Sequence, residues 1–109
     1  MTDEALTRLL GLGARARSVV IGVSGVRARL QQGKLACVVM AEDAGPRTRE
    51  KVERLAQARG IPVLRGPAAV RLGAALGRPP VQAAGVVDRA LARGLVAACG
   101  GVSGNNADS

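Results

Sequence analysis

The 109-residue sequence contains no histidine and no phenylalanine, tyrosine or tryptophan. Without histidine, the chain can form neither a Ser-His-Asp nor a Cys-His catalytic arrangement, and it has no imidazole ligand for a metal ion. Without aromatic rings, it lacks a platform for stacking bases, which argues against RNA binders that stack bases on a sheet face. The hydrophobic content of 48% is too high for a disordered chain. The core must therefore consist of Leu, Val, Ile and Ala.

Cysteines and long hydrophobic runs are also scarce. Cys37 and Cys99 are the only cysteines, and neither lies in a CxxC motif, so no metal site is expected. Cys37 lies in an apolar stretch and is expected to fill the core. That stretch, residues 35–41, is the longest apolar run and is too short to span a bilayer. With Asp3 and Glu4 near the N-terminus and only two isolated cysteines, we expect a cytoplasmic protein without membrane contact or cofactor.

Positive charge is abundant. The chain has 16 Lys and Arg residues against 8 Asp and Glu, a formal net charge of +8, and only Lys34 and Lys51 of the basic residues are not arginine. This excess predicts a polyanionic partner, although solvated charged faces without a partner would show the same composition. The length fits one domain. We expect a single, monomeric domain over residues 1–98 and a flexible tail over residues 99–109, which are rich in Gly, Ser, Asn and Asp.

The spacing of apolar residues predicts alternating helices and strands. Ser24 and Asp88 are candidate N-caps, Pro46 suits a first helical position, and Gly33 suits a helix end. The pattern predicts strands over residues 18–21, 35–41, 61–64 and 81–87, the last broken by Gly85, and helices over about 3–17, 23–32, 46–59, 68–76 and 89–98. The order α-β-α-β-α-β-α-β-α predicts an α/β fold with a mainly parallel or mixed sheet covered by helices.

The first candidate site is the turn Gly22-Val23-Ser24-Gly25, where a strand gives way to a helix. The free N–H groups of such a helix start can bind phosphate. The basic residues Arg15, Arg17, Arg27, Arg29 and Lys34 surround this turn in the sequence, and no acid lies between residues 15 and 34. The alternative is a simple helix cap. The sequence lacks the Gly-Lys-Ser/Thr ending of a P-loop.

Two further strand ends carry polar or flexible residues. Glu42 and Asp43 follow the apolar stretch; they could act in catalysis, bind Mg²⁺, accept from a base amino group, or bind loop amides and the start of the third helix. Arg65-Gly66-Pro67 follows the next strand, where Gly66 would allow close approach of the backbone to a ligand. An ordinary turn would show the same pattern.

These residues resemble a known family. The stretch from Gly22 to Ala44, which includes Leu-Ala-Cys-Val-Val-Met-Ala-Glu-Asp-Ala, together with Ile61-Pro62 and Leu-Gly-Ala-Ala-Leu-Gly over residues 72–77, resembles the ribosomal protein L-seven-Ae / L-thirty-e superfamily of RNA binders. The opening Leu-Leu-Gly-Leu over residues 9–12, with Arg15 and Arg17, is similar to its small bacterial YlxQ branch. The resemblance implies a three-layer α/β/α sandwich with a four-stranded mixed sheet. It also implies a non-catalytic role, with RNA bound at the three strand ends described above.

The best-studied members of that family recognise kink-turns through Gly-x-Asn-Glu at the start of the second helix and a Lys one turn later. Here those positions are Ser24, Gly25 and Ala28. We predict a non-enzymatic protein that binds structured RNA, kink-turn-like or ribosomal, with ribosome or translation-factor association. Two alternatives stay open: a protein-interaction module on the same fold, and a small enzyme using Glu42 and Asp43. The predicted RNA-binding residues are Arg15, Arg17, Gly22, Val23, Ser24, Gly25, Arg27, Arg29, Glu42, Asp43, Arg65, Gly66 and Pro67.

Overall fold

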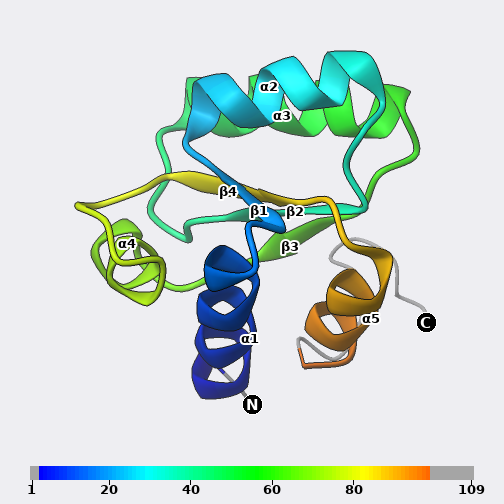
Figure 1. The fold of residues 1–109 in the computed structure, drawn as a ribbon. Helices are drawn as coiled ribbons and strands as arrows, with labels where there is room; N and C mark the ends of the chain where they lie inside the picture. Colours follow the sequence, from blue (N-terminus) through cyan, green and yellow to red (C-terminus); the bar gives the residue numbers. More distant parts are fainter. Residues whose placement is uncertain (1–2, 99–109) are drawn as a thin grey trace.

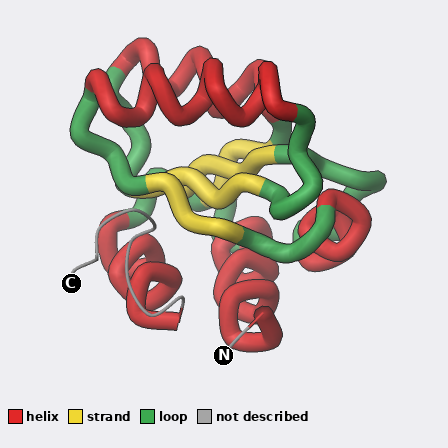
Figure 2. Tube along the Cα trace, turned by 180° about the vertical axis from the view of Figure 1, so that it is seen from behind, coloured by secondary structure: helices red, strands yellow, loops and turns green. Residues whose placement is uncertain are grey.

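The computed structural model describes residues 3–98 and shows a four-stranded sheet between two layers of helices (Figure 1). Helices α2 (Val23–Gln32) and α3 (Pro46–Ala58) cover one face of the sheet. Helices α1 (Asp3–Arg15), α4 (Ala69–Ala75) and α5 (Arg89–Ala98) cover the other, as the reverse view shows (Figure 2). The predicted three-layer α/β/α sandwich and its element order are confirmed. Cys99 and the predicted tail lie outside the described residues.

The sheet is mixed and has the strand order β1-β4-β2-β3. Strand β4 (Ala83–Val86) runs antiparallel to both β1 (Val19–Ile21) and β2 (Cys37–Met40), whereas β3 (Val63–Arg65) runs parallel to β2. It follows that β1, β2 and β3 all point the same way. Their C-terminal ends therefore lie at the same end of the sheet, and this brings together the three turns that the sequence singled out.

The core is aliphatic and lies on both faces of the sheet. All four residues of β2 are buried, as expected for a central strand of apolar residues covered on both sides. Leu6 and Leu10, four positions apart on α1, are fully covered, and Leu30 on α2 fills the opposite layer. Cys37 is buried within this core, as predicted. Among residues 3–98, no polar or charged residue is buried.

Every predicted strand is shorter in the structure. Ala36 joins the sheet only through its N–H, which donates to Val86 O at 2.6 Å, so β2 begins at Cys37. Pro62 has no N–H to donate and precedes β3, although its carbonyl accepts from Val38 N at 3.0 Å. This shifts β3 to residues 63–65, and β3 is an outer strand of the sheet, where a neighbouring proline is tolerated.

Three helix ends follow the predicted chemistry and one does not. Asp88 caps α5 by accepting from Ala90 N at 2.7 Å and Leu91 N at 3.2 Å. Pro46 opens α3, and Gly33 ends α2 in the left-handed conformation (φ 69°). Ser24, however, is not the cap of α2: that position is Gly22, and no side chain caps the helix.

Glycines weaken the elements less than the sequence suggested. Helix α1 continues through Gly13, where an ideal Cβ would collide with the Leu91 side chain of α5 and lie 2.9 Å from Val19 Cγ2. Strand β4 is unbroken at Gly85, because the Leu35 side chain fills the space that a Cβ would occupy. Both glycines permit close packing between elements. No helix within residues 3–98 is long and apolar enough to cross a membrane.

Candidate nucleic-acid interface

The predicted turns meet where β1, β2 and β3 end. Backbone hydrogen bonds hold them in place. Gly66 N donates to Met40 O at 2.7 Å and Glu42 N to Pro67 O at 3.1 Å, which joins the second and third turns, and Gly22 N donates to Ala83 O of the intervening strand β4 at 2.9 Å. We call the group formed by residues 22–25, 42–43 and 66–70 the turn cluster. Its parts are distant in the sequence, and the parallel direction of the three strands brings them to one edge.

Gly22 shapes the start of α2. Its backbone has φ 100° and ψ 154°, a region that is essentially restricted to glycine, and nothing lies within 4 Å of an ideal Cβ there. The glycine is therefore required by backbone conformation and not by lack of space. The first N–H groups of a helix have no acceptor within it, and here no side chain satisfies them. Ser24, in the first turn, is exposed. This helix start is available to an anion.

Asp43 links the second turn to the third. Its Oδ1 accepts a hydrogen bond of 2.8 Å from Ala69 N, at the first residue of α4. The sequence predicted that the Glu42-Asp43 pair would support a helix start, but it named the third helix, whereas Asp43 supports the fourth. The Glu42 side chain is exposed and forms no hydrogen bond or ion pair with any residue of the described part. Asp43 is therefore a positioning residue, and Glu42 is the freer carboxylate.

Replacement of Asp43 tests this positioning role. We expect Asp43→Ala to lower the free energy of unfolding by about 1 kcal/mol, the usual cost of losing a side-chain cap. Asp43→Asn retains the accepting oxygen and should cost only a few tenths of a kcal/mol in urea unfolding. Equal losses for both variants would show that the carboxylate charge, and not the hydrogen bond to Ala69 N, stabilises the turn.

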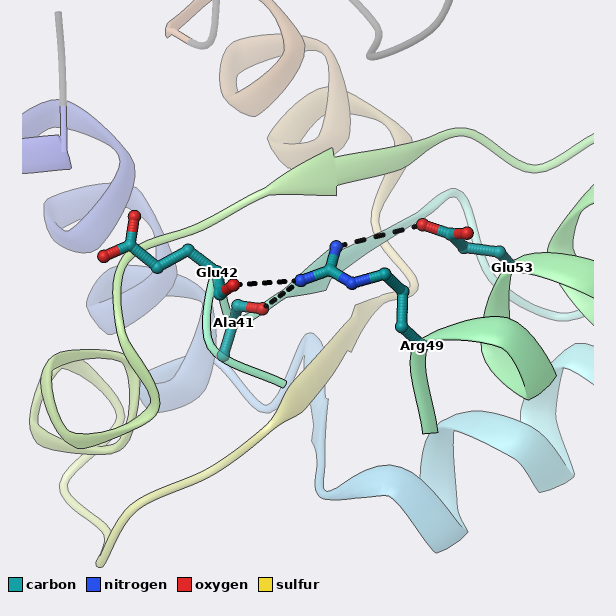
Figure 3. A network of polar contacts seen from close by, with 4 residues as sticks. All are labelled: Ala41, Glu42, Arg49 and Glu53. Atoms are coloured by element: carbon teal, nitrogen blue, oxygen red, sulfur yellow. Dashed lines mark hydrogen bonds and ion pairs between the residues drawn. The ribbon is translucent and has the colours of Figure 1, made fainter. Parts of the chain in front are cut away.

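Arg49 holds the same turn from the side of α3 (Figure 3). Its Nη2 donates to Ala41 O at 3.2 Å and to Glu42 O at 3.0 Å, while Nη1 lies 3.9 Å from Glu53 Oε2. Arg49 and Glu53 thus pair four positions apart on α3, and a second such pair joins Arg54 Nη2 to Glu50 Oε2 at 2.8 Å. The guanidinium of Arg49 is thus engaged by groups of the protein itself. The Glu42-Asp43 turn is held by Arg49 of α3 on one side and by Ala69 of α4 on the other.

Gly66 and Pro67 lie inside the turn cluster and not on its surface, because both are buried. An ideal Cβ on Gly66 would stand 2.7 Å from Val39 Cγ1 and 3.3 Å from Met40 O. The close approach that the sequence suggested is therefore an approach to β2, not to a ligand. Arg65, directly before them, is exposed at the end of the outer strand β3.

The basic side chains do not all surround the Gly22 turn, which corrects the sequence-based expectation. Arg15 and Arg17 precede β1 and so lie at its opposite end, and Lys34 follows the far end of α2. Gly25 packs closely against Val20 of β1. An ideal Cβ on Gly25 would lie only 2.7 Å from Val20 Cγ1. Arg29 follows Gly25 by four residues and shares that flank of α2. The arginines therefore extend from the turn cluster along the β1 edge.

These arginines differ in how firmly they are held. No ion pair or hydrogen bond joins the side chains of Arg15, Arg17, Arg29 and Arg65 to another residue of the described range. Arg27 is half-buried, and its Nε is covered and lacks a hydrogen-bond partner within residues 3–98. The exposed guanidinium groups are free to bind an anion from solution.

Arg17 is held in an unfavourable backbone conformation. It ends α1 in the left-handed region (φ 61°), the one non-glycine residue with positive φ in the described range. Arg17 N donates to Ala14 O and Ser18 N to Gly13 O, the helix-ending pattern that usually places glycine at this position. Arginine therefore occupies a backbone position at which glycine would make the folded protein more stable. Such local strain is typical of functional positions.

We expect Arg17→Gly to raise the free energy of unfolding by about 0.5–1 kcal/mol, because left-handed backbone no longer strains a side chain. RNA affinity should fall at the same time, because a cation is lost. Arg15→Gly removes the same charge from a helical position and should destabilise by about 1 kcal/mol. Denaturant unfolding and a binding titration measure both effects, and an unchanged RNA affinity in Arg17→Gly would exclude Arg17 from the interface.

Two exposed residues in or next to the turn cluster were not predicted. Val70 and Arg71 open α4 beside Ala69 and are exposed, Val70 by 64%. Val70, Leu72 and Leu76 are the bulky apolar residues of this segment. Only the latter two, four positions apart, share a buried face. Helical spacing could have shown that Val70 points elsewhere, but only the Asp43–Ala69 contact places it in this cluster.

The fold and the joined turns define a class of compact α/β/α proteins with a mixed four-stranded sheet. The chain belongs to the ribosomal protein L7Ae/L30e/S12e/Gadd45 family, whose model matches residues 4–96. The resemblance noted in the sequence is therefore confirmed at the level of the family. A comparison with curated protein sequences finds no match.

Solved structures share this fold. The chain is 33% identical to a protein of unknown function from Bacillus halodurans, with a TM-score of 0.84, over 87% of this chain and 96% of that one. A 15.5 kD RNA-binding protein from Giardia lamblia is 24% identical, with a TM-score of 0.73, over 89% of this chain and 83% of that one. The second likeness is evidence of the fold alone.

Proposed function

We propose that this protein binds structured RNA without catalysing a reaction, through the turn cluster and the arginines along the β1 edge. The observation that carries the proposal is the uncapped start of α2, with exposed Ser24 in its first turn, fixed beside two other turns. Helix N–H groups and guanidinium groups are the usual partners of phosphate oxygens. Membership of this family supports the proposal.

Backbone contacts should dominate over base reading. Ser24 and Gly25 replace the amide and carboxylate side chains that kink-turn readers of the family carry, so few groups can reach base edges. A missing bidentate base contact typically costs about 1–3 kcal/mol of discrimination. Arg17, Arg29 and Arg65 can contact phosphates of any sequence. The proposed ligand is therefore a structured RNA, such as a ribosomal RNA segment, bound by its shape and charge, and not a kink-turn recognised by sequence.

The non-catalytic part of the proposal follows from the residues of the turn cluster. Asp43 is engaged with Ala69 N, which leaves Glu42 without a second free carboxylate on its own turn. No three His, Cys, Asp or Glu residues gather into a metal-binding group within the described part of the chain. Binding to ribosomal RNA would place the protein in the cytoplasm, on or near the ribosome, as in the YlxQ branch that the opening residues resemble.

Salt dependence tests this proposal directly. We expect gel-shift affinity for a ribosomal RNA fragment to fall roughly fortyfold between about 50 and about 200 mM salt, if three phosphates are neutralised at about 0.9 each on a log-log scale. A kink-turn RNA and an internal loop without G·A pairs should bind within about threefold of each other, because few base edges are contacted. Salt-independent binding, or no binding at low salt, would favour the alternative of a protein-interaction module.

A further inference from the structure

A second surface feature lies at the opposite edge of the sheet from the turn cluster. Residues 33–36 lead into β2, residues 59–62 precede β3, and α5 lies across from them. Together they line an open groove of about 590 Å³. Since β2 and β3 are parallel, their N-terminal ends lie here and their C-terminal ends lie in the turn cluster. The groove is therefore separate from the turn cluster, and it lies at the end of the sheet where Arg15 and Arg17 precede β1.

The floor of the groove is aliphatic. Leu35 and Ala92 are nearly covered, whereas Ile61, Pro62 and Val96 are half-buried and still reach solvent. Partly covered aliphatic side chains in a concave surface gain from contact with another apolar group. The floor thus favours a ligand with an aliphatic side chain of its own.

The rim of the groove is positive. Arg59, Arg89 and Arg93 line it, and no Asp or Glu is among the lining residues. Asp88, directly before Arg89, is engaged in capping α5. The Arg59 guanidinium donates to Gln31 O, but the side chains of Arg89 and Arg93 form no hydrogen bond or ion pair within residues 3–98. Arg89 and Arg93 are four positions apart, so their like charges repel each other. Arg89 also stands in the first turn of α5, where the positive end of the helix dipole disfavours a cation. An anion between Arg89 and Arg93 would offset this repulsion.

We propose that this groove docks a peptide segment of a partner protein that carries carboxylates next to an aliphatic side chain. The charge complementarity requires the carboxylates, and the aliphatic floor requires the apolar side chain. An RNA strand would satisfy the arginines but would leave the floor without a matching group, since no aromatic residue in the chain can stack on a base. The protein would then join an RNA at one edge of its sheet to a protein at the other.

A selection from a random peptide display library on the full chain tests this proposal. We expect the enriched peptides to combine Asp or Glu with Leu, Ile or Val. Measured by fluorescence polarisation, their affinity should fall at least tenfold for Arg89→Glu with Arg93→Glu, and at least fivefold for Val96→Asn. The matched control is Arg47→Glu with Lys51→Glu, an exposed pair four positions apart on α3, which should change the affinity less than threefold.

Several outcomes would overturn the proposal. These are a failure to enrich any peptide, enrichment of peptides without acids, or equal losses for the two charge-reversed pairs when circular dichroism shows both folded. Tenfold tighter peptide binding by full-length Asp108→Asn would show that the chain's own C-terminal acid competes for the groove. A larger loss of ribosomal RNA affinity in the Arg89 and Arg93 variant than in the control would make the groove an RNA contact. Because the peptide titration contains no RNA, it can fail while the proposed RNA binding stands.

Discussion

Ser24→Glu is expected to weaken RNA binding at least tenfold while leaving the fold as stable as before. Ser24 is exposed in the first turn of α2 and does not act as its cap, so the substitution removes no contact that the structure shows. A glutamate in the first turn of a helix is favourable by about 0.3–1 kcal/mol, because it faces the positive end of the helix dipole. The free energy of unfolding should therefore stay level or rise slightly.

The expected loss of affinity comes from charge repulsion. A carboxylate about 5 Å from a phosphate is repelled by about 1–3 kcal/mol for effective dielectric constants between those of water and a protein surface. A loss of 1.4 kcal/mol already corresponds to about tenfold in affinity. The negative charge would also occupy the N–H groups that the proposal assigns to RNA.

Gln57→Glu is the matched control for Ser24→Glu. It adds the same charge at an exposed position on α3, distant in the sequence from the turn cluster. Its effect on gel-shift affinity should stay below about threefold at moderate salt, where the Debye length is about 8–10 Å. Equal losses for the two variants would mean that only net charge matters, and the turn cluster would not be the interface.

Gly73→Ala is expected to cause the largest loss of stability, about 3 kcal/mol or more. Gly73 is buried in α4, and an ideal Cβ there would lie 2.7 Å from the carbonyl carbon of Pro79 and 2.9 Å from Arg78 O. These are backbone atoms, so no side-chain rotation can relieve the overlap. Overpacking usually costs about 1–3 kcal/mol, and a collision with backbone belongs at the upper end or beyond.

Gly94→Ala provides the comparison within another helix. An ideal Cβ on Gly94 would be 3.5 Å from Leu9 Cδ1, an ordinary contact. Because alanine is the better helix former by about 1 kcal/mol, this variant should be more stable than the wild type. Thermal unfolding measures both changes. A Gly73→Ala protein as stable as Gly94→Ala would mean that the loop at Pro79 can move away from α4 at little cost.

The architecture followed from sequence because local signals agreed with one another. The apolar stretch around Cys37 and Val38 indicated a central strand, Pro46 marked a helix start, and Asp88 marked another. Strand ends were less predictable, because Leu35 and Ala36 are as apolar as the strand that they precede. Whether such residues join the ladder depends on backbone hydrogen bonds, and hydropathy does not encode these.

The candidate site was only partly accessible to sequence reasoning. The turns at Gly22, Asp43 and Gly66 were found because each follows an apolar segment, and the parallel strands bring them together. The positions of Arg15 and Arg17 were misjudged, because closeness in sequence does not show on which end of a strand a residue lies. The pairing of Asp43 with Ala69 spans 26 residues, and no local pattern reports it.

The two outermost strands of the sheet, β1 and β3, have only three residues each. Each outer strand therefore exposes only a short row of unpaired backbone N–H and C=O groups, to which a strand of another chain could hardly pair. Strand β3 also ends in the exposed cation Arg65. The brevity of both outer strands, with the charge of Arg65 on β3, protects a protein rich in Val, Leu and Ala against growing into aggregates.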